Sequence, residues 1–290
     1  MDAARGDGRR TEWRGSDGAL VALCRSVRDV LLPRGCAGCD MPDAVLCDDC
    51  RALFDRCHGR ELQGSLSGMA YAAAIYQGVV RRCILDWKDH DDVELDGSFA
   101  RILIATLARS GLMSVLSSLS AMPDCGPDLR RPVLVVPAPS SPASMRRRGR
   151  RHLMPLVRAL SEALCESGIP SRPSLALVST AGGGRSVQQI SAAQRAQRIG
   201  GHIAVAPGAS LRGAPVLLVD DIITTGSTLR QCTDVLRHAG ALPVGALALA
   251  QAVASHRGDG EGDESDGGET GGMGTRRHAT YGVRLRQRPR

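Results

Sequence analysis

Two adjacent carboxylates, Asp220 and Asp221, stand shortly before a run of hydroxyl and glycine residues. That run consists of Thr224, Thr225, Gly226, Ser227 and Thr228. Carboxylates accept hydrogen bonds from sugar hydroxyls, and a turn of small residues offers backbone N–H groups and hydroxyl donors to a phosphate. The order of residue types therefore indicates a site for a phosphorylated sugar. The competing interpretation is an ordinary strand-to-helix turn in which an Asp or Thr caps the helix.

The segments on both sides of this run have the patterns of the elements that must position it. Residues 216–219 are all apolar and predict a buried parallel strand, and residues 228–238 predict a helix. Open α/β sheets bind ligands at the carboxyl ends of their strands, and a helix that starts there directs the positive end of its dipole at an anion. The acid pair and the turn are therefore expected at one edge of a sheet.

A second group of residues has the chemistry of metal ligands. Four cysteines form two Cys-x2-Cys pairs that seven residues separate: Cys36, Cys39, Cys47 and Cys50. Four thiolates at this spacing suit a tetrahedral structural Zn²⁺ ion, and Gly38 eases the turn within the first pair. The alternatives are disulfide bonds, which are rare in cytoplasmic proteins, a redox-active Cys-x-x-Cys and an iron–sulfur cluster. Cys57 and His58 are near enough along the chain to substitute as ligands, although four cysteines already complete the site.

Composition limits the functions that these two groups can serve. The chain has 290 residues, enough for one α/β domain with a small module and tails. Its 37 Lys and Arg against 30 Asp and Glu give a net charge of +7, which suits a phosphate-rich ligand or a nucleic-acid surface and establishes neither. Aromatic residues make up only 2%, which argues against the stacking platforms that bind single strands. A structural or interaction role for the zinc module is favoured, and contact with DNA or RNA stays as the alternative.

The N-terminal pattern and the lack of long apolar runs predict a location. No apolar run reaches the length of about 20 residues that a membrane helix needs, so no membrane insertion is expected. Arg9 and Arg10 precede only a short apolar stretch at residues 19–24, and Arg25 and Arg28 follow it. This pattern disfavours a secretory or twin-arginine signal, and a cytoplasmic protein is expected.

The pattern along the chain predicts a mainly parallel sheet, because strands and helices alternate from residue 132 onward. The expected strands cover residues 71–75, 133–136, 175–178, 202–205, 216–219 and 244–249, and the expected helices cover 18–32, 78–87, 99–112, 153–166 and 228–238. The domain boundaries expected are a disordered N-terminus (1–16), a helix with a zinc-ribbon module (17–60), an α/β domain (70–254), a disordered acidic Gly-rich segment (255–279) and a basic C-terminus (280–290). Val283 and Leu285 allow a further edge strand there.

The acidic pair with its turn, residues 216–229, resembles the motif with which type I phosphoribosyltransferases bind phosphoribosyl pyrophosphate (PRPP). With the four-cysteine module in front, residues 20–250 resemble the ComF family of phosphoribosyltransferase-like proteins, which are linked to competence and DNA uptake in several bacteria. Further matching segments are Leu32-Pro33, Tyr76 to Arg81 with Lys88 downstream, Val135 to Pro139, and Arg146 to Gly149. The resemblance implies a type I phosphoribosyltransferase-like parallel sheet flanked by helices, behind a small four-cysteine zinc module.

The resemblance also implies roles for individual residues. Asp220 and Asp221 hold the ribose 2′- and 3′-hydroxyls and orient C1, which makes them the catalytic candidates, while residues 224–228 cradle the 5′-phosphate. The loop with Ala138, Pro139 and Ser140 binds pyrophosphate, and Arg148 and Lys88 add positive charge. Mg²⁺ accompanies PRPP as a cofactor, and Zn²⁺ is structural.

Several positions depart from the family pattern. Relatives continue the Arg-Gly pair as Phe-Asn-Gln, whereas this chain has Arg150, Arg151 and His152. An asparagine position downstream holds Arg198, while Arg195 is kept and Gly182 to Arg185 form a candidate loop over the ligand. Three functions therefore stay open: a PRPP-dependent transferase with an unknown acceptor, a non-catalytic sensor of PRPP or a nucleotide, and a zinc-bearing adaptor in the DNA-uptake machinery. The acceptor and the oligomeric state are not predicted.

Overall fold

The structure is a computed structural model that describes residues 35–90, 92–120, 131–180 and 202–253. The chain divides into two compact units, Met1–Ala254 and Ser255–Arg290, and the described residues all belong to the first. Several expectations lie outside the described residues: the helix at 18–32, disorder at 1–16 and 255–279, the edge strand near Val283, and the loop and arginines between Gly182 and Arg198.

The centre of the described unit is a six-stranded sheet in the order β1-β2-β8-β7-β3-β4. The strands are β1 His58–Glu61, β2 Met69–Ile75, β3 Val133–Pro137, β4 Ser171–Pro173, β7 Pro215–Ile223 and β8 Leu242–Gln251. Neighbouring strands run parallel except β1, which pairs antiparallel with β2. The central strands are apolar over most of their length because helices and loops cover both faces, and this requirement makes their sequence pattern easy to recognise.

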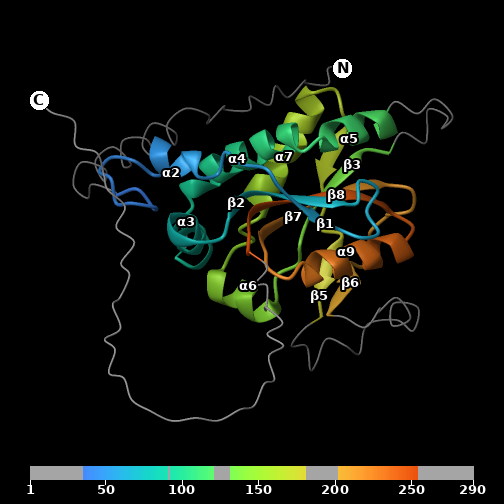
Figure 1. Ribbon diagram of the computed structural model, residues 1–290. Coiled ribbons are helices and arrows are strands. Elements are labelled where there is room, and N and C mark those ends of the chain that lie inside the picture. Colours follow the sequence, from blue (N-terminus) through green and yellow to red (C-terminus); the bar gives the residue numbers. More distant parts are fainter. Residues whose placement is uncertain (1–34, 91, 121–130, 181–201, 254–290) are drawn as a thin grey trace, which may run out of the picture. The chain divides into compact units, whose positions relative to one another are not determined.

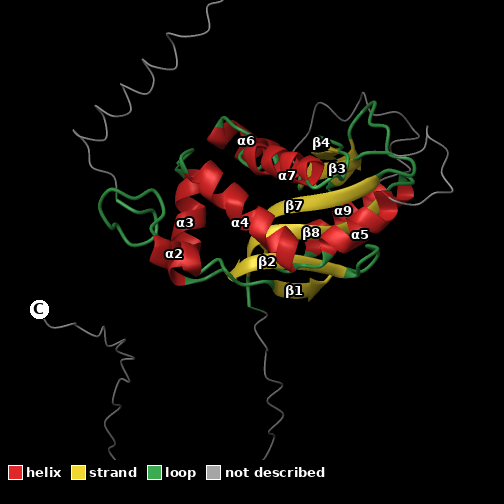
Figure 2. Cartoon of the chain, turned by 90° about the horizontal axis from the view of Figure 1, so that it is seen from above, coloured by secondary structure: helices red, strands yellow, loops and turns green. Residues whose placement is uncertain are grey.

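Both faces of this sheet are covered by other elements of the chain (Figure 1). One face carries the helices α3 Gly78–Asp89, α4 Leu95–Arg109, α5 Leu112–Ser120 and α7 Met154–Glu166. Figure 2 looks onto that face and shows these helices across the strands. The other face carries α9 Ser227–His238 and a two-stranded antiparallel sheet of β5 Leu177–Ser179 and β6 Ile203–Val205. Two short helices, α2 Asp48–Ala52 and α6 Pro142–Arg148, complete the described elements.

The mainly parallel α/β sheet with flanking helices that the sequence predicts is confirmed. The strands expected at 71–75, 133–136, 216–219 and 244–249 are β2, β3, β7 and β8, and the helices expected at 78–87, 153–166 and 228–238 are α3, α7 and α9. Each apolar strand runs one or more residues beyond its predicted bounds, because backbone pairing continues through polar or small residues that the pattern treats as strand ends.

The helix expected at 99–112 exists, but its predicted end at residue 112 is wrong. The chain forms α4 Leu95–Arg109, turns at Gly111 with a φ of 74°, and starts α5 at Leu112. The hydroxyl of Ser110 accepts a hydrogen bond from the Leu112 backbone N–H at 3.2 Å, which helps to begin the second helix. The apolar pattern continues across the break and therefore conceals it.

The strands expected at 175–178 and 202–205 exist, but they do not join the parallel sheet. They form the separate antiparallel pair β5 and β6, and β4 Ser171–Pro173 takes the edge position next to β3 instead. The sequence did not predict β4 or β1. Both are short and polar, as edge strands often are, so no apolar pattern marks them.

Within the described residues, no single helix has the length and apolar composition of a membrane span. One bent pair, Leu95–Arg109 with Leu112–Leu119, meets the length and composition test together across a 76° break.

A matched pair of glycine substitutions tests the packing between α5 and the sheet. A Cβ at Gly245 would lie 2.8 Å from Leu112 Cδ2, 2.8 Å from Ser67 Oγ and 2.9 Å from the Met69 carbonyl oxygen. We expect Gly245→Ala to lower the free energy of unfolding by about 1–3 kcal/mol, because the strand and helix must separate. Gly97→Ala, in an exposed part of α4 with open space around it, should raise that free energy by about 0.5–1 kcal/mol. Urea denaturation measures both, and an unaffected Gly245→Ala protein would contradict this packing.

Candidate functional site

The sequence suggested that the acid pair follows the end of its strand. The structure instead places both residues inside β7. β7 continues to Ile223, with Asp220 opposite Ala248 of β8. Successive side chains of a strand point to opposite faces of the sheet, so the two carboxylates diverge. Asp221 contacts residues on the face of α3 and α7, whereas the charge of Asp220 acts on Cys232 of α9 on the other face. The two carboxylates therefore have different surroundings.

Asp221 is held by two nitrogen donors that come from distant parts of the chain. Lys88 Nζ lies 2.5 Å from Asp221 Oδ2, and His152 Nε2 lies 2.9 Å from the same oxygen. Lys88 belongs to the last turn of α3, and His152 precedes α7. The His152 side chain is only 2% exposed and meets the edge of Trp87 at 5.0 Å between ring centroids. A carboxylate can only accept, so His152 donates through Nε2–H.

The surroundings move the two carboxyl pKa values in opposite directions. Burial alone would raise the pKa of Asp221, but the hydrogen bond from His152 and the charge of Lys88 lower it overall. Burial raises the pKa of Asp220, and the negative charge of Asp221 raises it further. The backbone N–H of Asp221 donates to Asp220 Oδ1 at 2.9 Å and offsets only part of this rise. Asp221 is thus the ionised member of the pair, and Asp220 binds a proton more readily.

The predicted phosphate turn connects β7 to α9. Gly226 is the N-cap of α9 with a φ of 74°, a conformation that favours glycine, and Ser227 is the first helical residue. Thr225 Oγ1 donates to Ser227 Oγ at 2.9 Å and accepts from the Ser227 backbone N–H at 3.3 Å. Thr224, Thr225 and Thr228 are exposed, so their hydroxyls are accessible to a ligand. The turn therefore combines exposed hydroxyls with the N-terminal end of a three-turn helix.

Two arginines that the motif did not reveal hold this turn. Arg60 of β1 donates to the carbonyl oxygen of Thr224, and Arg230 of α9 donates to that of Thr225 at 3.0 Å. Both guanidiniums bring positive charge to the turn and fix the carbonyl groups between the two elements. Arg230 lies four residues after Gly226, so its closeness to the turn could be expected from the sequence. Arg60 is 164 residues from Thr224, and nothing in the sequence indicates that contact.

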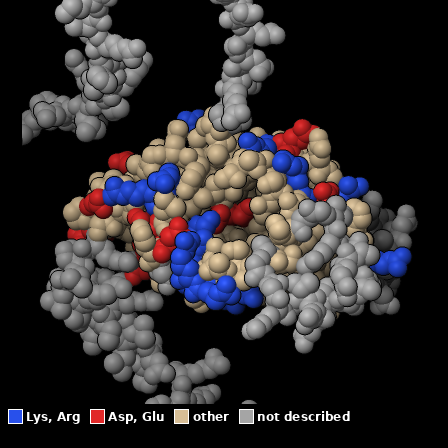
Figure 3. Space-filling view, turned by 90° about the horizontal axis from the view of Figure 1, so that it is seen from below, with Lys and Arg blue, Asp and Glu red and all other residues tan. Residues whose placement is uncertain are grey.

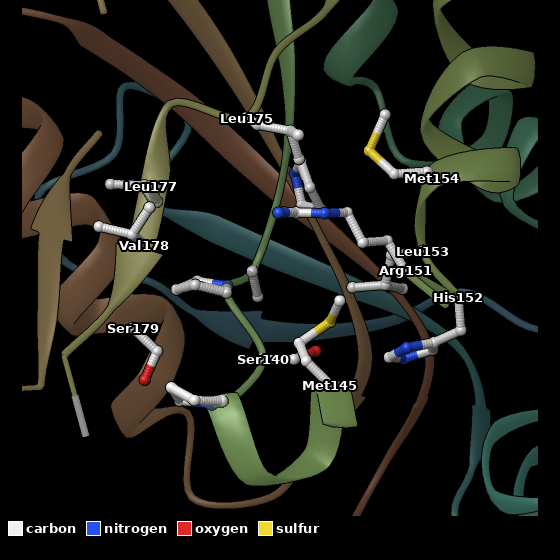
Figure 4. Close-up of a pocket in the computed structure, with 14 residues that line it drawn as sticks. Ser140, Met145, Arg151, His152, Leu153, Met154, Leu175, Leu177, Val178 and Ser179 are labelled. Carbon is white, nitrogen blue, oxygen red and sulfur yellow. The ribbon is translucent and has the colours of Figure 1, made fainter. Parts of the chain in front are cut away.

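The predicted pyrophosphate loop, Ala138 to Ser140, follows β3 and lies beside β7. The Ala138 backbone N–H donates to the Val219 carbonyl oxygen at 2.7 Å, which joins the loop to the strand that bears the acid pair. On its other side, the loop lines a cavity of about 190 Å³ (Figure 4). The side chains of His152 and Arg151 also line this cavity, together with apolar residues of β5.

Arg148 lies in the cluster, but an acidic partner already engages it. Its Nε is 3.4 Å from Asp89 Oδ1, and Arg147 Nη2 is 3.0 Å from the same oxygen. The Arg148 side chain is only 8% exposed, and its Nη1 lies 3.4 Å from His152 Nδ1. Figure 3 shows basic side chains gathered beside acidic ones on this face. Arg148 therefore contacts Nδ1 of the His152 ring, while Nε2 of the same ring contacts Asp221.

The altered segment after Gly149 contributes the residues that the sequence most clearly failed to place. His152, one of the residues that depart from the expected pattern, is a partner of Asp221. Arg150 donates to both oxygens of Asp96 at 3.0 and 3.1 Å and lies 5.9 Å from the Trp87 ring centroid. The departure from the family pattern was visible in the sequence, but the partners of these side chains were not.

The four cysteines converge as a metal site requires. The sulfur atoms of Cys36, Cys39, Cys47 and Cys50 all lie within 4.8 Å of one another. In a tetrahedron with Zn–S bonds of about 2.3 Å, sulfur atoms are about 3.8 Å apart, so the group fits this ion. Among the described residues, neither Cys57 nor His58 belongs to the group. Zinc is thus consistent with the donors that are present.

Hydrogen bonds from the backbone favour the thiolate form of one cysteine, the form that binds metals. Burial alone would raise the pKa of Cys36, but the backbone N–H groups of Cys47 and Gly38 donate to its sulfur at 3.3 and 3.4 Å and lower it overall. Burial and the neighbouring sulfurs raise the pKa of Cys50. A cation at the centre of the group would favour thiolates at all four positions.

Comparison with known proteins agrees with these features. Residues 173–266 match the family model for the phosphoribosyl transferase domain. An orotate phosphoribosyltransferase from Thioalkalivibrio sulfidiphilus is 51% identical over 59 residues, which are 19% of this chain and 26% of that protein. The chain thus spans about a quarter of the length of this relative. The sequence matches support a phosphoribosyltransferase-type family for the chain.

Solved structures with similarity include an adenine phosphoribosyltransferase, at 11% identity, 71% of this chain, 89% of that chain and a TM-score of 0.32. Another is described as the allosteric regulatory enzyme of purine biosynthesis, at 27% identity, 50% of this chain, 26% of that chain and a TM-score of 0.27. Scores this low carry no argument of their own.

Opposite stability effects should distinguish the two carboxylates. Folding raises the pKa of Asp220 above its ordinary value of 3.8, so its charge destabilises the folded state increasingly as pH rises through the interval between the two values. Asp220→Asn should therefore raise the free energy of unfolding at about pH 7.5, with little effect near the ordinary pKa.

Folding lowers the pKa of Asp221, so its charge stabilises the folded state above 3.8, and this contribution disappears as pH falls through the lowered value. Asp221→Asn should lower the free energy of unfolding by about 1–3 kcal/mol at about pH 7.5, because Lys88 and His152 lose an ionic partner. Urea titrations of both variants at several pH values test the assignment. Effects of the same sign at neutral pH would refute it.

Proposed function

We propose that this chain binds PRPP with Mg²⁺ at the carboxyl ends of β3 and β7, and that it is a ComF-like member of the phosphoribosyltransferase-type family. The observation that carries the proposal is the convergence of three ligand-binding features in one place. The acid pair of β7, the hydroxyl-rich turn at the N-terminus of α9 and the small-residue loop after β3 lie on adjacent strands. A ribose with a phosphate on each side needs this combination of acceptors and anion donors.

Each part of PRPP has a group that suits it. The hydroxyls and N–H groups of residues 224–228 suit the 5′-phosphate, and the charges of Arg60 and Arg230 strengthen that site. The carboxylates of the acid pair are acceptors that suit ribose hydroxyls. The loop of residues 138–140 suits pyrophosphate, and Lys88, the partner of Asp221, is the cation that the ComF resemblance assigns to it. Mg²⁺, when bound with PRPP, neutralises charge on the departing pyrophosphate.

If the chain transfers the phosphoribosyl group, the reaction is a displacement at ribose C1. The C1–O bond to pyrophosphate breaks, and pyrophosphate leaves with the electron pair. An acceptor nitrogen forms the new bond to C1 and loses its proton to solvent or to a basic group. The role of the acid pair is to hold the ribose, so that C1 faces the acceptor in a near-attack position.

A PRPP sensor without efficient turnover is the second candidate, and one observation favours it. The cations expected to assist the leaving group already have acidic partners: Lys88 binds Asp221, and Arg147 and Arg148 bind Asp89. Binding of PRPP needs few of them, whereas stabilisation of departing pyrophosphate needs several. A place in the DNA-uptake machinery and contact with nucleic acid rest on the ComF resemblance alone.

Calorimetry with PRPP and Mg²⁺ tests the binding site. We expect the Asp220→Asn/Asp221→Asn protein to lose at least about tenfold in affinity, equivalent to about 1.4 kcal/mol. Arg60→Ala should weaken binding by about threefold to tenfold, because a charge beside the 5′-phosphate is lost. Arg172→Ala, an exposed change on the edge strand β4, is the control and should bind as the wild type does. Equal affinity of the wild type and the double variant would remove the site assignment.

Release of pyrophosphate separates the two candidate functions. Wild-type protein with PRPP, Mg²⁺ and a panel of bases and amines should release pyrophosphate with at least one acceptor if it is a transferase. Release that depends on the acceptor and disappears in the double variant supports the transferase. PRPP binding with no release for any acceptor supports the sensor.

A further inference from the structure

Helix α3, Gly78–Asp89, touches both the four-cysteine module and the acid pair. Its first turn contacts the module, and its last turn carries Lys88, the partner of Asp221. A helix of 12 residues is about 18 Å long, so one rigid element joins two sites that are far apart. Figure 1 shows α3 near the module at one end of the sheet.

The contact between the module and α3 is tight. Val79 packs against the buried group of Cys36, Cys47 and Cys50. A Cβ at Gly38, between the first two cysteines, would lie 2.6 Å from Cys50 Sγ and 2.7 Å from Val79 Cγ1. The backbone of the first knuckle therefore lies directly between a metal ligand and α3, and only glycine fits there.

An ion pair fixes the same contact from the outside. Arg82, one helical turn beyond Val79, pairs with Asp40 in the turn after the first cysteine pair. Asp40 has a φ of 60°, so a particular turn conformation presents its carboxylate. Asp40 N–H also donates to the Cys36 carbonyl oxygen at 2.9 Å, which ties this turn to a metal ligand.

The other end of α3 is equally engaged. Trp87 is fully buried and meets His152, Lys88 binds Asp221, and Asp89 pairs with Arg147 and Arg148. Between the two ends, Cys83 and Ile84 are fully buried in the core below the helix. Because packed cores deform little, the middle of α3 is rigid, and a shift of its first turn must move its last turn as well.

We propose that occupation of the four-cysteine site positions α3, and through it Lys88, so that the metal and PRPP bind cooperatively. Val79 and Arg82 are the positioning residues in this link. This inference rests on the PRPP site proposed above. The cysteine group has few apolar neighbours to hold it together without a metal: Ala44 and Leu46 of the module and Val79 of α3 pack against it, whereas Ala37, Val45 and Phe54 pack into the larger core. Loss of the metal therefore releases the surface against which α3 is held.

Cooperativity of this kind is reciprocal. If zinc raises the affinity for PRPP by some factor, PRPP must raise the affinity for zinc by the same factor. A residue that only stabilises the fold does not need to link the two affinities in this way. A coupling factor different from one is thus the signature of coupling between the two sites, and a factor of about fivefold to a hundredfold is typical of such systems.

The experiment measures both affinities with the full chain. Calorimetry gives the affinity for PRPP with Mg²⁺ for the zinc-loaded protein and for protein treated with a chelator and shown by circular dichroism to remain folded. Competition with a chromophoric chelator gives the zinc affinity with and without PRPP. We expect removal of zinc to weaken PRPP binding about tenfold, and removal of PRPP to weaken zinc binding by the same factor.

Two arginine variants isolate the link on zinc-loaded protein. Arg82→Ala removes the ion pair between the module and α3, and should weaken PRPP binding severalfold and reduce the coupling factor, while zinc stays bound. Arg82→Lys should restore most of both. Arg51→Ala is the matched control, because Arg51 and Asp48 form a similarly exposed ion pair within the short helix α2 of the module. It should change neither affinity.

The outcomes separate the two proposals. No PRPP binding by the zinc-loaded wild type would reject the proposed function. PRPP binding that is the same with and without zinc in folded protein would reject the link and leave the proposed function standing. If the chelator unfolds the chain, the Arg82→Ala protein decides the matter. PRPP affinity equal to that of Arg51→Ala would then reject the link, and a severalfold loss that Arg82→Lys restores would support it.

Discussion

The arrangement of this site depends on the need to compensate a buried carboxylate in a parallel strand. Asp221 lies in β7 among apolar neighbours, where an unpaired charge is very costly. Lys88 and His152 meet this need at one oxygen, and they come from the end of α3 and from the segment before α7. The pairing therefore fixes how these two elements approach the sheet. Further charge pairs join Asp89 to Arg147 in the last turn of α6 and Asp96 to Arg150 just after that helix, and they hold the same elements in place.

The other carboxylate has no such compensation. Asp220 faces the side of α9, and among the described residues no cation forms an ion pair with it. Two neighbouring acids thus have pKa values that their surroundings move apart, which often marks a functional pair. The protein retains a poorly compensated carboxylate at the position where the proposed ribose would supply hydroxyl donors. A ligand with hydroxyls and a divalent cation would relieve that cost, which is one physical reason for such a site to bind PRPP.

The elements that the sequence predicted are those with the most buried side chains. The strands β3, β7 and β8 and the helices α3, α7 and α9 carry patterns that their buried surroundings require, so the sequence predicted them. The polar edge strands β1 and β4 were missed because their pairing depends on the neighbouring backbone and not on their own side chains. The break at Gly111 was missed because both helices beside it bury apolar residues with a similar period.

The sequence by itself determined the two groups whose chemistry is contiguous in the chain: the acid pair with its turn, and the four cysteines, which converge as their spacing predicts. Short spacing limits the geometry that such residues can adopt, so their grouping can be read directly from the sequence. Only the tertiary structure decided the partners of these groups. It placed His152 and Lys88 on one oxygen of Asp221, Arg60 on the phosphate turn, and α3 between the cysteine module and the acid pair. These contacts join residues far apart in the chain, and packing of the helices on the sheet selects them, which no local pattern encodes.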